Sequence, residues 1–306
     1  MMKVNPKILT VDRLCELYYL SKDYRDLREK TQKDYKYCLD ILIDTDNFKT
    51  KKVLDITTPL CKQAYEQWKE RGLSQANKVV AISTVVFSYA TEMGYTSINP
   101  FKGVKRKSAK VKRIIWEEEE VKKFLDVAYS DFSYRNIGLI VHMAYEWGQR
   151  IGDMRLLTWN NIKWEDKQLY LEQSKKRREV FLPIGDDLFS MLQKQKEDFG
   201  FQEYVAPQVR PARGVYVPYT LTNVSKYSNC VIKLAGLRQE LQLMHLRATA
   251  ITEMNDAGVP INQIMSVSGH VNPQSVQPYI KHTFKSANFA LNQRNSNKTL
   301  DRKTKS

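Results

Sequence analysis

Residues 268–279 read SGHVNPQSVQPY, and they place Tyr279, the last tyrosine of the chain, nine residues after His270. Two arginines lie upstream in apolar surroundings: Arg150 follows the stretch MAYEWGQ, and Arg247 lies within LMHLRATAI. The structural alternative for either arginine is an ion pair with a carboxylate, for which Asp153 is the nearest candidate. Two such arginines in one basic chain instead favour phosphate binding, because guanidinium groups bind phosphate oxygens in a bidentate way.

The overall charge points in the same direction. The chain has 306 residues, with 49 Lys and Arg against 34 Asp and Glu, which gives a net charge of +15. An excess of this size favours a polyanionic partner, most simply nucleic acid, although a membrane-surface or ribosomal protein would have a similar composition. No apolar run approaches the ~20 residues of a membrane span, and the N-terminus lacks the pattern of a signal peptide.

Other kinds of chemistry lack their sequence signatures. The four cysteines lie far apart without a CxxC pair, so we expect reduced thiols and no zinc module. Neither GxxxxGK[ST] nor GxGxxG occurs, and no His, Asp or Glu cluster has the spacing of a metal site. We therefore expect an enzyme or binding protein without cofactor or metal.

The hydrophobic pattern predicts a mostly α-helical chain with a small antiparallel β-sheet in its C-terminal domain. Strands are expected at 168–172 and 179–183, separated by the basic turn SKKRR at 174–178. Helices are expected around 188–196, 220–234 and 246–256 in the same domain.

The chain divides into three expected parts: a helical domain at 1–101, a basic linker at 102–114 and a second domain at 115–306. The linker sequence KGVKRKSAKVKR offers almost nothing to bury and suits a segment that follows phosphates. The residues expected to contact DNA are Lys102, Lys105, Arg106, Lys107, Lys110, Lys112 and Arg113 in the linker, and Lys176 and Arg177 in the turn.

The order arginine, basic hairpin turn, arginine, Gly-His and tyrosine resembles the tyrosine recombinase (phage integrase) family. GQRIGD at 148–153 matches the first arginine motif of that family, and Lys175 matches the lysine of its hairpin. LRAT at 246–249 matches the second arginine motif, and 269–270 matches the Gly-His motif, with Tyr279 at the usual distance. The N-terminal helices and Asn99-Pro100 resemble the core-site DNA-binding domain of the family, so the resemblance covers nearly the whole chain.

The resemblance implies a site-specific DNA recombinase or integrase for phage or mobile-element integration and excision. Tyr279 would form a covalent 3′-phosphotyrosine, Arg150 and Arg247 would bind the phosphate, His270 would donate to it, and Lys175 would protonate the leaving 5′-oxygen. The reaction would need neither metal nor ATP and would pass through a Holliday junction. The implied partners are double-stranded DNA with a specific recombination site, three further copies in a homotetramer, and accessory DNA-bending or directionality proteins, in a cytoplasmic, nucleoid-associated setting away from membranes.

One position departs from the family pattern. Three residues before the second arginine the family usually has histidine, but here the residue is Met244, whose thioether cannot accept a proton. His245 is the neighbouring candidate, although one step along a helix rotates a side chain by about 100°. A missing base would slow cleavage by about 10²- to 10⁴-fold. Two other functions stay open, DNA relaxation as in type IB topoisomerases and DNA binding without catalysis, with RNA binding a distant alternative.

Overall fold

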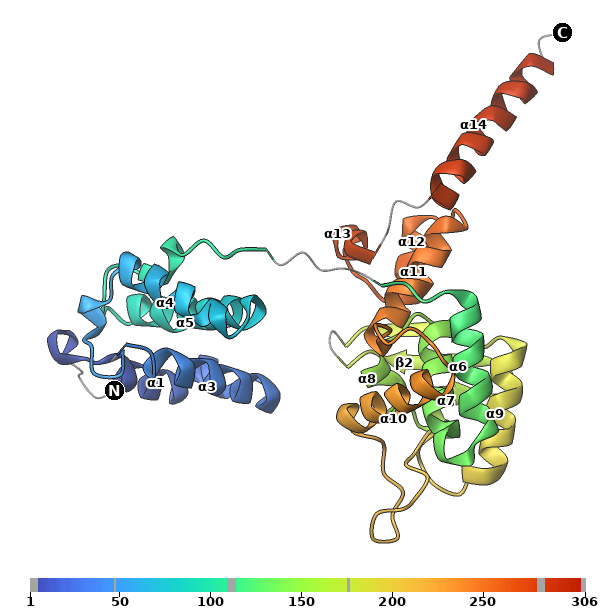
Figure 1. Ribbon diagram of the computed structural model, residues 1–306, viewed down its shortest axis with the longest axis horizontal. Helices are drawn as coiled ribbons and strands as arrows, with labels where there is room; N and C mark the ends of the chain where they lie inside the picture. Colours follow the sequence, from blue (N-terminus) through green and yellow to red (C-terminus); the bar gives the residue numbers. More distant parts are fainter. Residues whose placement is uncertain (1–4, 47, 109–113, 175–176, 280–283, 304–306) are drawn as a thin grey trace. The chain divides into compact units, whose positions relative to one another are not determined.

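The computed structural model describes residues 5–46, 48–108, 114–174, 177–279 and 284–303. The chain forms two compact units, Met1–Val111 and Lys112–Ser306. Both units are mostly helical, and the second contains a small antiparallel sheet (Figure 1). The expected fold class is therefore confirmed. In the described part of the chain, no helix is both long enough and apolar enough to cross a membrane.

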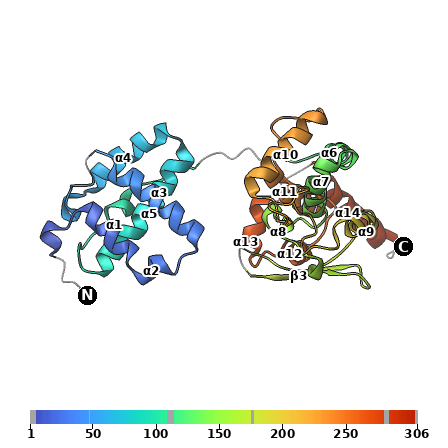
Figure 2. The same cartoon turned by 90° about the horizontal axis from the view of Figure 1, so that it is seen from below.

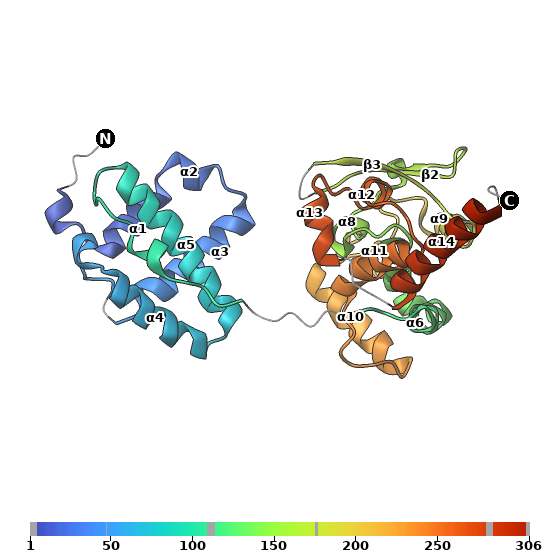
Figure 3. The same ribbon diagram turned by 90° about the horizontal axis from the view of Figure 1, so that it is seen from above.

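The N-terminal unit is a helical bundle built around one long apolar helix. Its helices are α1 (Val11–Tyr19), α2 (Lys22–Arg25), α3 (Glu29–Ile43), α4 (Thr58–Glu70) and α5 (Leu73–Glu92). Helix α5 packs against α1, α3 and α4, and it occupies the middle of this unit in Figures 2 and 3. It can do so because the apolar side chains of α5, among them Val79, Ile82 and Val86, are almost completely buried.

The start of the basic segment 102–114 lies on the N-terminal unit. Phe101 is buried and stacks on Trp68, with ring centroids 6.4 Å apart. The backbone N–H of Lys107 donates to the Tyr65 hydroxyl at 2.9 Å, and its carbonyl accepts from Asn77 at 2.8 Å. These contacts fix the backbone as far as residue 107, while the side chains of Lys102, Lys105, Arg106 and Lys107 face solvent.

The C-terminal unit is organised around a buried helix. Its elements are α6 (Glu118–Ser130), α7 (Phe132–Glu146), α8 (Ile151–Met154), β1 (Ile162–Lys163), β2 (Gln168–Glu172), β3 (Glu179–Pro183), α9 (Asp186–Phe199), α10 (Leu221–Leu234), α11 (Leu246–Asp256), α12 (Ile261–Ser268), α13 (Pro273–Val276) and α14 (Phe284–Lys303). Helix α7 contacts α6, α8, α9, α10 and α11. It approaches α6 closely at Gly138, where a Cβ atom would lie 2.8 Å from that of Ala128.

The sheet has the order β1-β2-β3, with both pairs antiparallel. Leu169 pairs with Leu182 and Leu171 with Val180, and all four side chains point into the core. The alternation of apolar and polar residues in both long strands produces this one-sided burial. Just after β2, the N–H of Ser174 donates to Oδ1 of Asp153 in α8, so this end of the sheet lies beside the first arginine motif.

Helix α14 follows the nucleophile motif and extends away from the body of its unit (Figure 1). It contacts α11. Gly258 ends α11 with a left-handed backbone (φ +76°), and a Cβ atom there would lie 2.4–3.0 Å from the ring of Phe289. Glycine is therefore needed at this position both for the left-handed turn and for the packing of Phe289, and with it α14, against the end of α11.

Candidate active site

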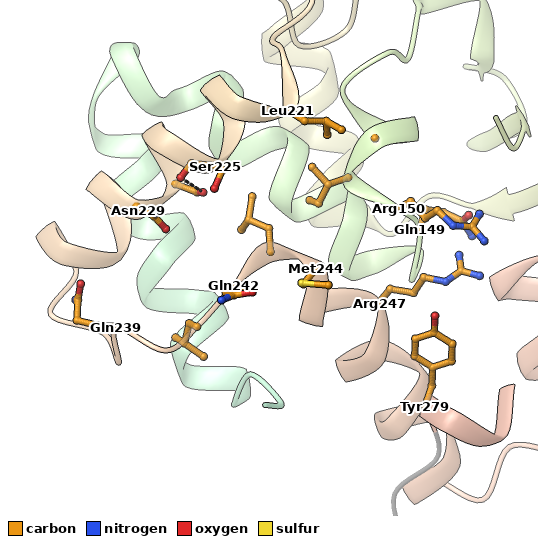
Figure 4. Close-up of a pocket in the computed structure, with 15 residues that line it drawn as sticks. Gln149, Arg150, Leu221, Ser225, Asn229, Gln239, Gln242, Met244, Arg247 and Tyr279 are labelled. Carbon is orange, nitrogen blue, oxygen red and sulfur yellow. Dashed lines mark hydrogen bonds between the residues drawn. The ribbon is translucent and has the colours of Figure 1, made fainter. Parts of the chain in front are cut away.

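The candidate site is a pocket of about 640 Å³ in the C-terminal unit. Arg150, Arg247, Met244 and Tyr279 line one end of it, and their side chains come together in Figure 4. The rest of the lining mixes neutral polar and apolar side chains, namely Ser225, Ser228, Asn229, Gln239 and Gln242 with Leu221, Leu241 and Leu243. Three of the residues expected to act on a phosphate thus meet in one pocket, although they are up to 129 positions apart in the sequence.

Arg150 is positioned by the way α7 ends. Gly148 adopts a left-handed conformation (φ +56°), which turns the chain so that Arg150 becomes the N-cap of α8. Its Nη1 donates to Gln173 Oε1 at 3.3 Å and lies 3.8 Å from Oδ2 of Asp153. Its side chain keeps 28% of its area exposed, so the guanidinium is held from behind and open towards the pocket.

Arg247 lies in the first turn of α11 and is almost completely buried, at 5% exposure. Its Nη1 donates to the carbonyl of Gly148 at 3.2 Å, and its Nη2 donates to that of Ser268 at 2.6 Å. Burial, together with repulsion from the nearby charge of Arg150, lowers the pKa of Arg247 to about 10. A bound anion would relieve both effects, so the site is built to receive negative charge.

His270 is placed by the tight end of α12. Gly269 has a left-handed backbone (φ 70°) and lets the chain reverse immediately before the histidine. The His270 ring is buried, with Nδ1 2.8 Å from Ser268 Oγ and 3.2 Å from Arg247 Nη2. The histidine of the Gly-His motif therefore contacts Arg247, the second arginine of the family pattern.

Tyr279 ends a short 3-10 helix, Gln277–Tyr279, that follows α13. Its backbone carbonyl accepts from Thr252 Oγ1 at 2.9 Å, which ties it to α11. Its ring packs on the small core of Ile251, Ile264 and Val276, and its centroid lies 5.4 Å from that of His270. In Figure 4 its hydroxyl points towards the guanidinium of Arg247.

Several expected site residues lie outside the residues that the structure describes. These are Lys175 and Lys176 in the β2–β3 turn, and Lys110, Lys112 and Arg113 in the linker. The backbone on either side of the turn is described: Ser174 N donates to Asp153 Oδ1 at 3.3 Å, and Arg177 has a left-handed backbone (φ 49°).

The remaining expected DNA contacts are exposed. Lys102, Lys105, Arg106 and Lys107 have solvent-exposed side chains on the N-terminal unit, and Arg177 is exposed at the hairpin of the other unit. Their placement suits contact with a phosphate backbone, which needs accessible cations. Their role stays a prediction.

Met244 and His245 are placed differently with respect to the pocket. Met244 lines it, is 73% exposed and lies beside Arg247 in Figure 4. His245 does not line the pocket; it is the N-cap residue of α11, and its carbonyl accepts from Thr249 Oγ1 at 3.1 Å. The side chain three positions before Arg247 is therefore the one that faces the reactive groups.

Two buried glutamines contribute to the site without having been expected from the sequence. Gln149 and Gln173 are at most 1% exposed, and they hydrogen-bond to each other at 2.6 Å. Gln149 adjoins Arg150 in the sequence, and Gln173 precedes the basic turn, so their proximity to motif residues was the available signal. Among the described residues, no group of three or more His, Cys, Asp or Glu is arranged to hold a metal ion.

Residues 115–286 match the family model described as the phage integrase family. The match spans more than half of the chain, so the chain belongs to the phage integrase family, whose members are the tyrosine recombinases, DNA breaking and rejoining enzymes. The predicted family is therefore confirmed. A comparison with curated protein sequences gives no significant match.

Solved structures of two integrases share this fold. Lambda integrase, as a dimer bound to a COC′ core site, has a TM-score of 0.76 at 22% identity, over 89% of this chain and 77% of that one. A lambda integrase tetramer bound to a Holliday junction has a TM-score of 0.75 at 21% identity, over 89% and 78%. The Tn1549 transposon integrase in complex with circular intermediate DNA has a TM-score of 0.74 at 15% identity, over 92% and 99%.

Proposed function

We propose that this protein is a site-specific DNA recombinase that cuts and rejoins DNA through a covalent 3′-phosphotyrosine at Tyr279. The observation that carries the proposal is the meeting of Tyr279 with Arg150 and Arg247 in one pocket. The integrase fold and the DNA in the structures of its relatives support the same reading. Integration and excision of a phage or mobile element is the process that this activity would serve.

The chemistry follows from the side chains. The Tyr279 oxygen attacks the scissile phosphorus and its proton passes to water, since Met244 cannot accept it; a P–O bond to tyrosine forms, and the bond to the 5′-oxygen breaks. Arg150 and Arg247 bind the non-bridging oxygens, where charge grows in the transition state, and His270 donates a further hydrogen bond. Lys175 gives its proton to the departing 5′-oxygen. Because the phosphotyrosine conserves the energy of the phosphodiester, the proposed reaction consumes neither ATP nor a metal-activated water.

Exchange between two duplexes requires two strands to be cut on each, and therefore four active sites. We propose a homotetramer on paired recombination sites with a Holliday junction as intermediate, as the lambda integrase tetramer on such a junction supports. Accessory DNA-bending or directionality proteins are further expected partners. The N-terminal unit and the basic segment after it would bind the core site, through Lys102, Lys105, Arg106 and Lys107 and the linker cations beyond them.

The test is to trap the covalent intermediate. Nicked suicide duplexes from a library of the DNA flanking the gene are incubated with the protein, with metal chelated and without ATP. We expect an adduct that resists denaturation with the wild type and is absent with Tyr279→Phe. Salt-sensitive duplex binding without any adduct would instead assign the protein to non-catalytic DNA binding. Relaxation of supercoiled DNA without strand exchange would assign it to topoisomerase-like activity, and an adduct with Tyr279→Phe would refute the choice of nucleophile.

A further inference from the structure

Gln173 lies at the junction between the sheet and the candidate active site. It directly follows β2, and its side chain is completely buried. Its backbone N–H donates to the carbonyl of Arg178 at 2.8 Å, and its carbonyl accepts from the N–H of Arg177 at 2.8 Å. The backbone of Gln173 therefore closes the base of the β2–β3 turn, in which Lys175 is found.

The orientation of the Gln173 amide is fixed by its neighbour Gln149. The Nε2 atom of Gln149 donates to the carbonyls of Trp147 at 3.0 Å and Val267 at 2.7 Å. Two carbonyl acceptors require the NH₂ end of the amide, so Gln149 must present its oxygen to Gln173. Gln173 in turn must offer its NH₂ group to that oxygen, at 2.6 Å.

This orientation leaves the Gln173 oxygen facing an arginine. Its Oε1 accepts from Arg150 Nη1 at 3.3 Å, while its Nε2 also donates to the carbonyl of Ser268 at 3.0 Å. The same carbonyl accepts from Arg247 Nη2 at 2.6 Å. One buried amide thus contacts Arg150 directly and Arg247 through a shared acceptor.

The Gly-His motif is shaped around this amide. A Cβ atom on Gly269 would lie 2.4–2.7 Å from the amide atoms of Gln173, closer than real Cβ atoms approach. Glycine at 269 therefore provides the space that Gln173 occupies, in addition to the left-handed turn before His270. Gln173 therefore contacts Arg150 of the first arginine motif and packs against Gly269 of the Gly-His motif, and it shares the Ser268 carbonyl with Arg247.

We propose that Gln173 is a positioning residue for DNA cleavage: its amide orients the guanidinium of Arg150 and links it, through the shared Ser268 carbonyl, to Arg247. The inference rests on the function proposed above and adds a residue that does not itself touch the phosphate. A buried amide with its donors and its acceptor engaged has a single favourable orientation, and this orientation is transferred to the groups that it holds. The two guanidinium groups that are expected to bind the phosphate are then aligned by the same side chain.

The experiment compares Gln173→Glu and Gln173→Leu with the wild type on a suicide duplex that the wild type cleaves. Glu keeps the size of Gln but loses both N–H donors, and Leu loses all polar contacts. We expect adduct formation at saturating DNA to slow by about 10- to 100-fold in both, as for other residues that orient reactive groups. The Kd for the duplex should not change, because Gln173 is buried behind the arginines.

A matched control separates positioning from stability. Gln195 is also buried (2% exposed) in the same unit, and its Nε2 donates to Asn136 Oδ1 and to the Val205 carbonyl, both at 2.9 Å. Gln195→Leu should lower the free energy of unfolding as Gln173→Leu does, yet leave the cleavage rate at saturating DNA unchanged. Equal slowing in both variants would show a loss of fold and refute the inference.

A second readout tests the arginines specifically. A methylphosphonate at the scissile position removes one charged non-bridging oxygen, so cleavage of this substrate depends less on Arg150 and Arg247. We expect the defect of Gln173→Glu to be smaller on the methylphosphonate than on the phosphate. Wild-type rates in both Gln173 variants, or an equal defect on both substrates, would refute the positioning role alone. Absence of a wild-type adduct would refute the proposed function and this inference with it.

Discussion

Replacement of Arg247 by methionine should leave the folded chain as stable as before, or more so, while it disables cleavage. Burial and the nearby charge of Arg150 lower the pKa of this guanidinium from its ordinary value to about 10. At about 1.4 kcal/mol per pKa unit, the charged form costs the folded chain about 3 kcal/mol. Arg247→Met removes that cost and keeps a long apolar stem in the same space.

The substitution also breaks hydrogen bonds. The Ser268 carbonyl keeps its bond from Gln173, but the Gly148 carbonyl loses the bond from Arg247, and an unsatisfied buried acceptor costs about 1–3 kcal/mol. The two effects together predict a free energy of unfolding between unchanged and about 2 kcal/mol higher than that of the wild type. Cleavage should fall by about 10²- to 10³-fold, as for loss of one donor to a developing oxyanion.

The assay is urea unfolding without DNA, followed by tryptophan fluorescence. Four of the five tryptophans, Trp116, Trp147, Trp159 and Trp164, lie in the C-terminal unit and report on it. Because folding lowers the pKa of Arg247, the cost of its buried charge is fully present below pH 10 and is lost as the pH rises above that value. Measurement at pH 7 therefore shows the whole effect.

The control is Arg238→Met. Arg238 is partly exposed and pairs with Glu120 at 2.6 Å, so its loss should lower stability by at most about 1 kcal/mol and leave cleavage unchanged. A larger loss of stability in Arg247→Met than in Arg238→Met would refute the reasoning, because it would mean that the buried charge stabilises the free protein.

Three further outcomes are expected. Met244→His places an imidazole in the pocket, so adduct formation should accelerate by up to about 10²-fold above pH ~6.5, where the ring is neutral; a rate profile from pH 5 to 9 checks this. Phe124→Ala empties a fully buried site and should lower the free energy of unfolding by about 3–5 kcal/mol in urea. Gly258→Ala places a side chain at a φ of +76° and against the ring of Phe289, so limited proteolysis should cut α14 faster. Adding Phe289→Ala to this variant should relieve the clash but not the backbone strain.

The sequence predicted the regular elements of the C-terminal unit well where one local pattern dominates. The expected strands at 168–172 and 179–183 coincide with β2 and β3, because alternating apolar residues flank a turn of polar residues. The expected helix at 246–256 coincides with α11. The two-residue strand β1 was not expected, because its pairing with β2 is a tertiary contact and two residues have no period.

For the candidate site, the sequence predicted which residue types would meet but not how they are held. The apolar neighbours of Arg247 indicated burial, and the structure confirms it at 5% exposure. The bond from Gln173 to the Ser268 carbonyl spans 95 positions, and nothing local in either segment encodes it. Met244 was identified as the departure from the family pattern, whereas its exposure in the pocket depends on how the 3-10 turn Leu243–His245 enters α11.

Helix α11 carries Arg247 and also holds Tyr279 in place, through the hydrogen bond from Thr252 to the Tyr279 carbonyl. Arg247 and Thr252 are five residues apart on this helix, which corresponds to about 7.5 Å of axial rise. An insertion or deletion between 247 and 252 would change both the axial distance and the rotation between Arg247 and Thr252. This stretch of α11 should therefore tolerate amino-acid substitutions during evolution but no insertion or deletion.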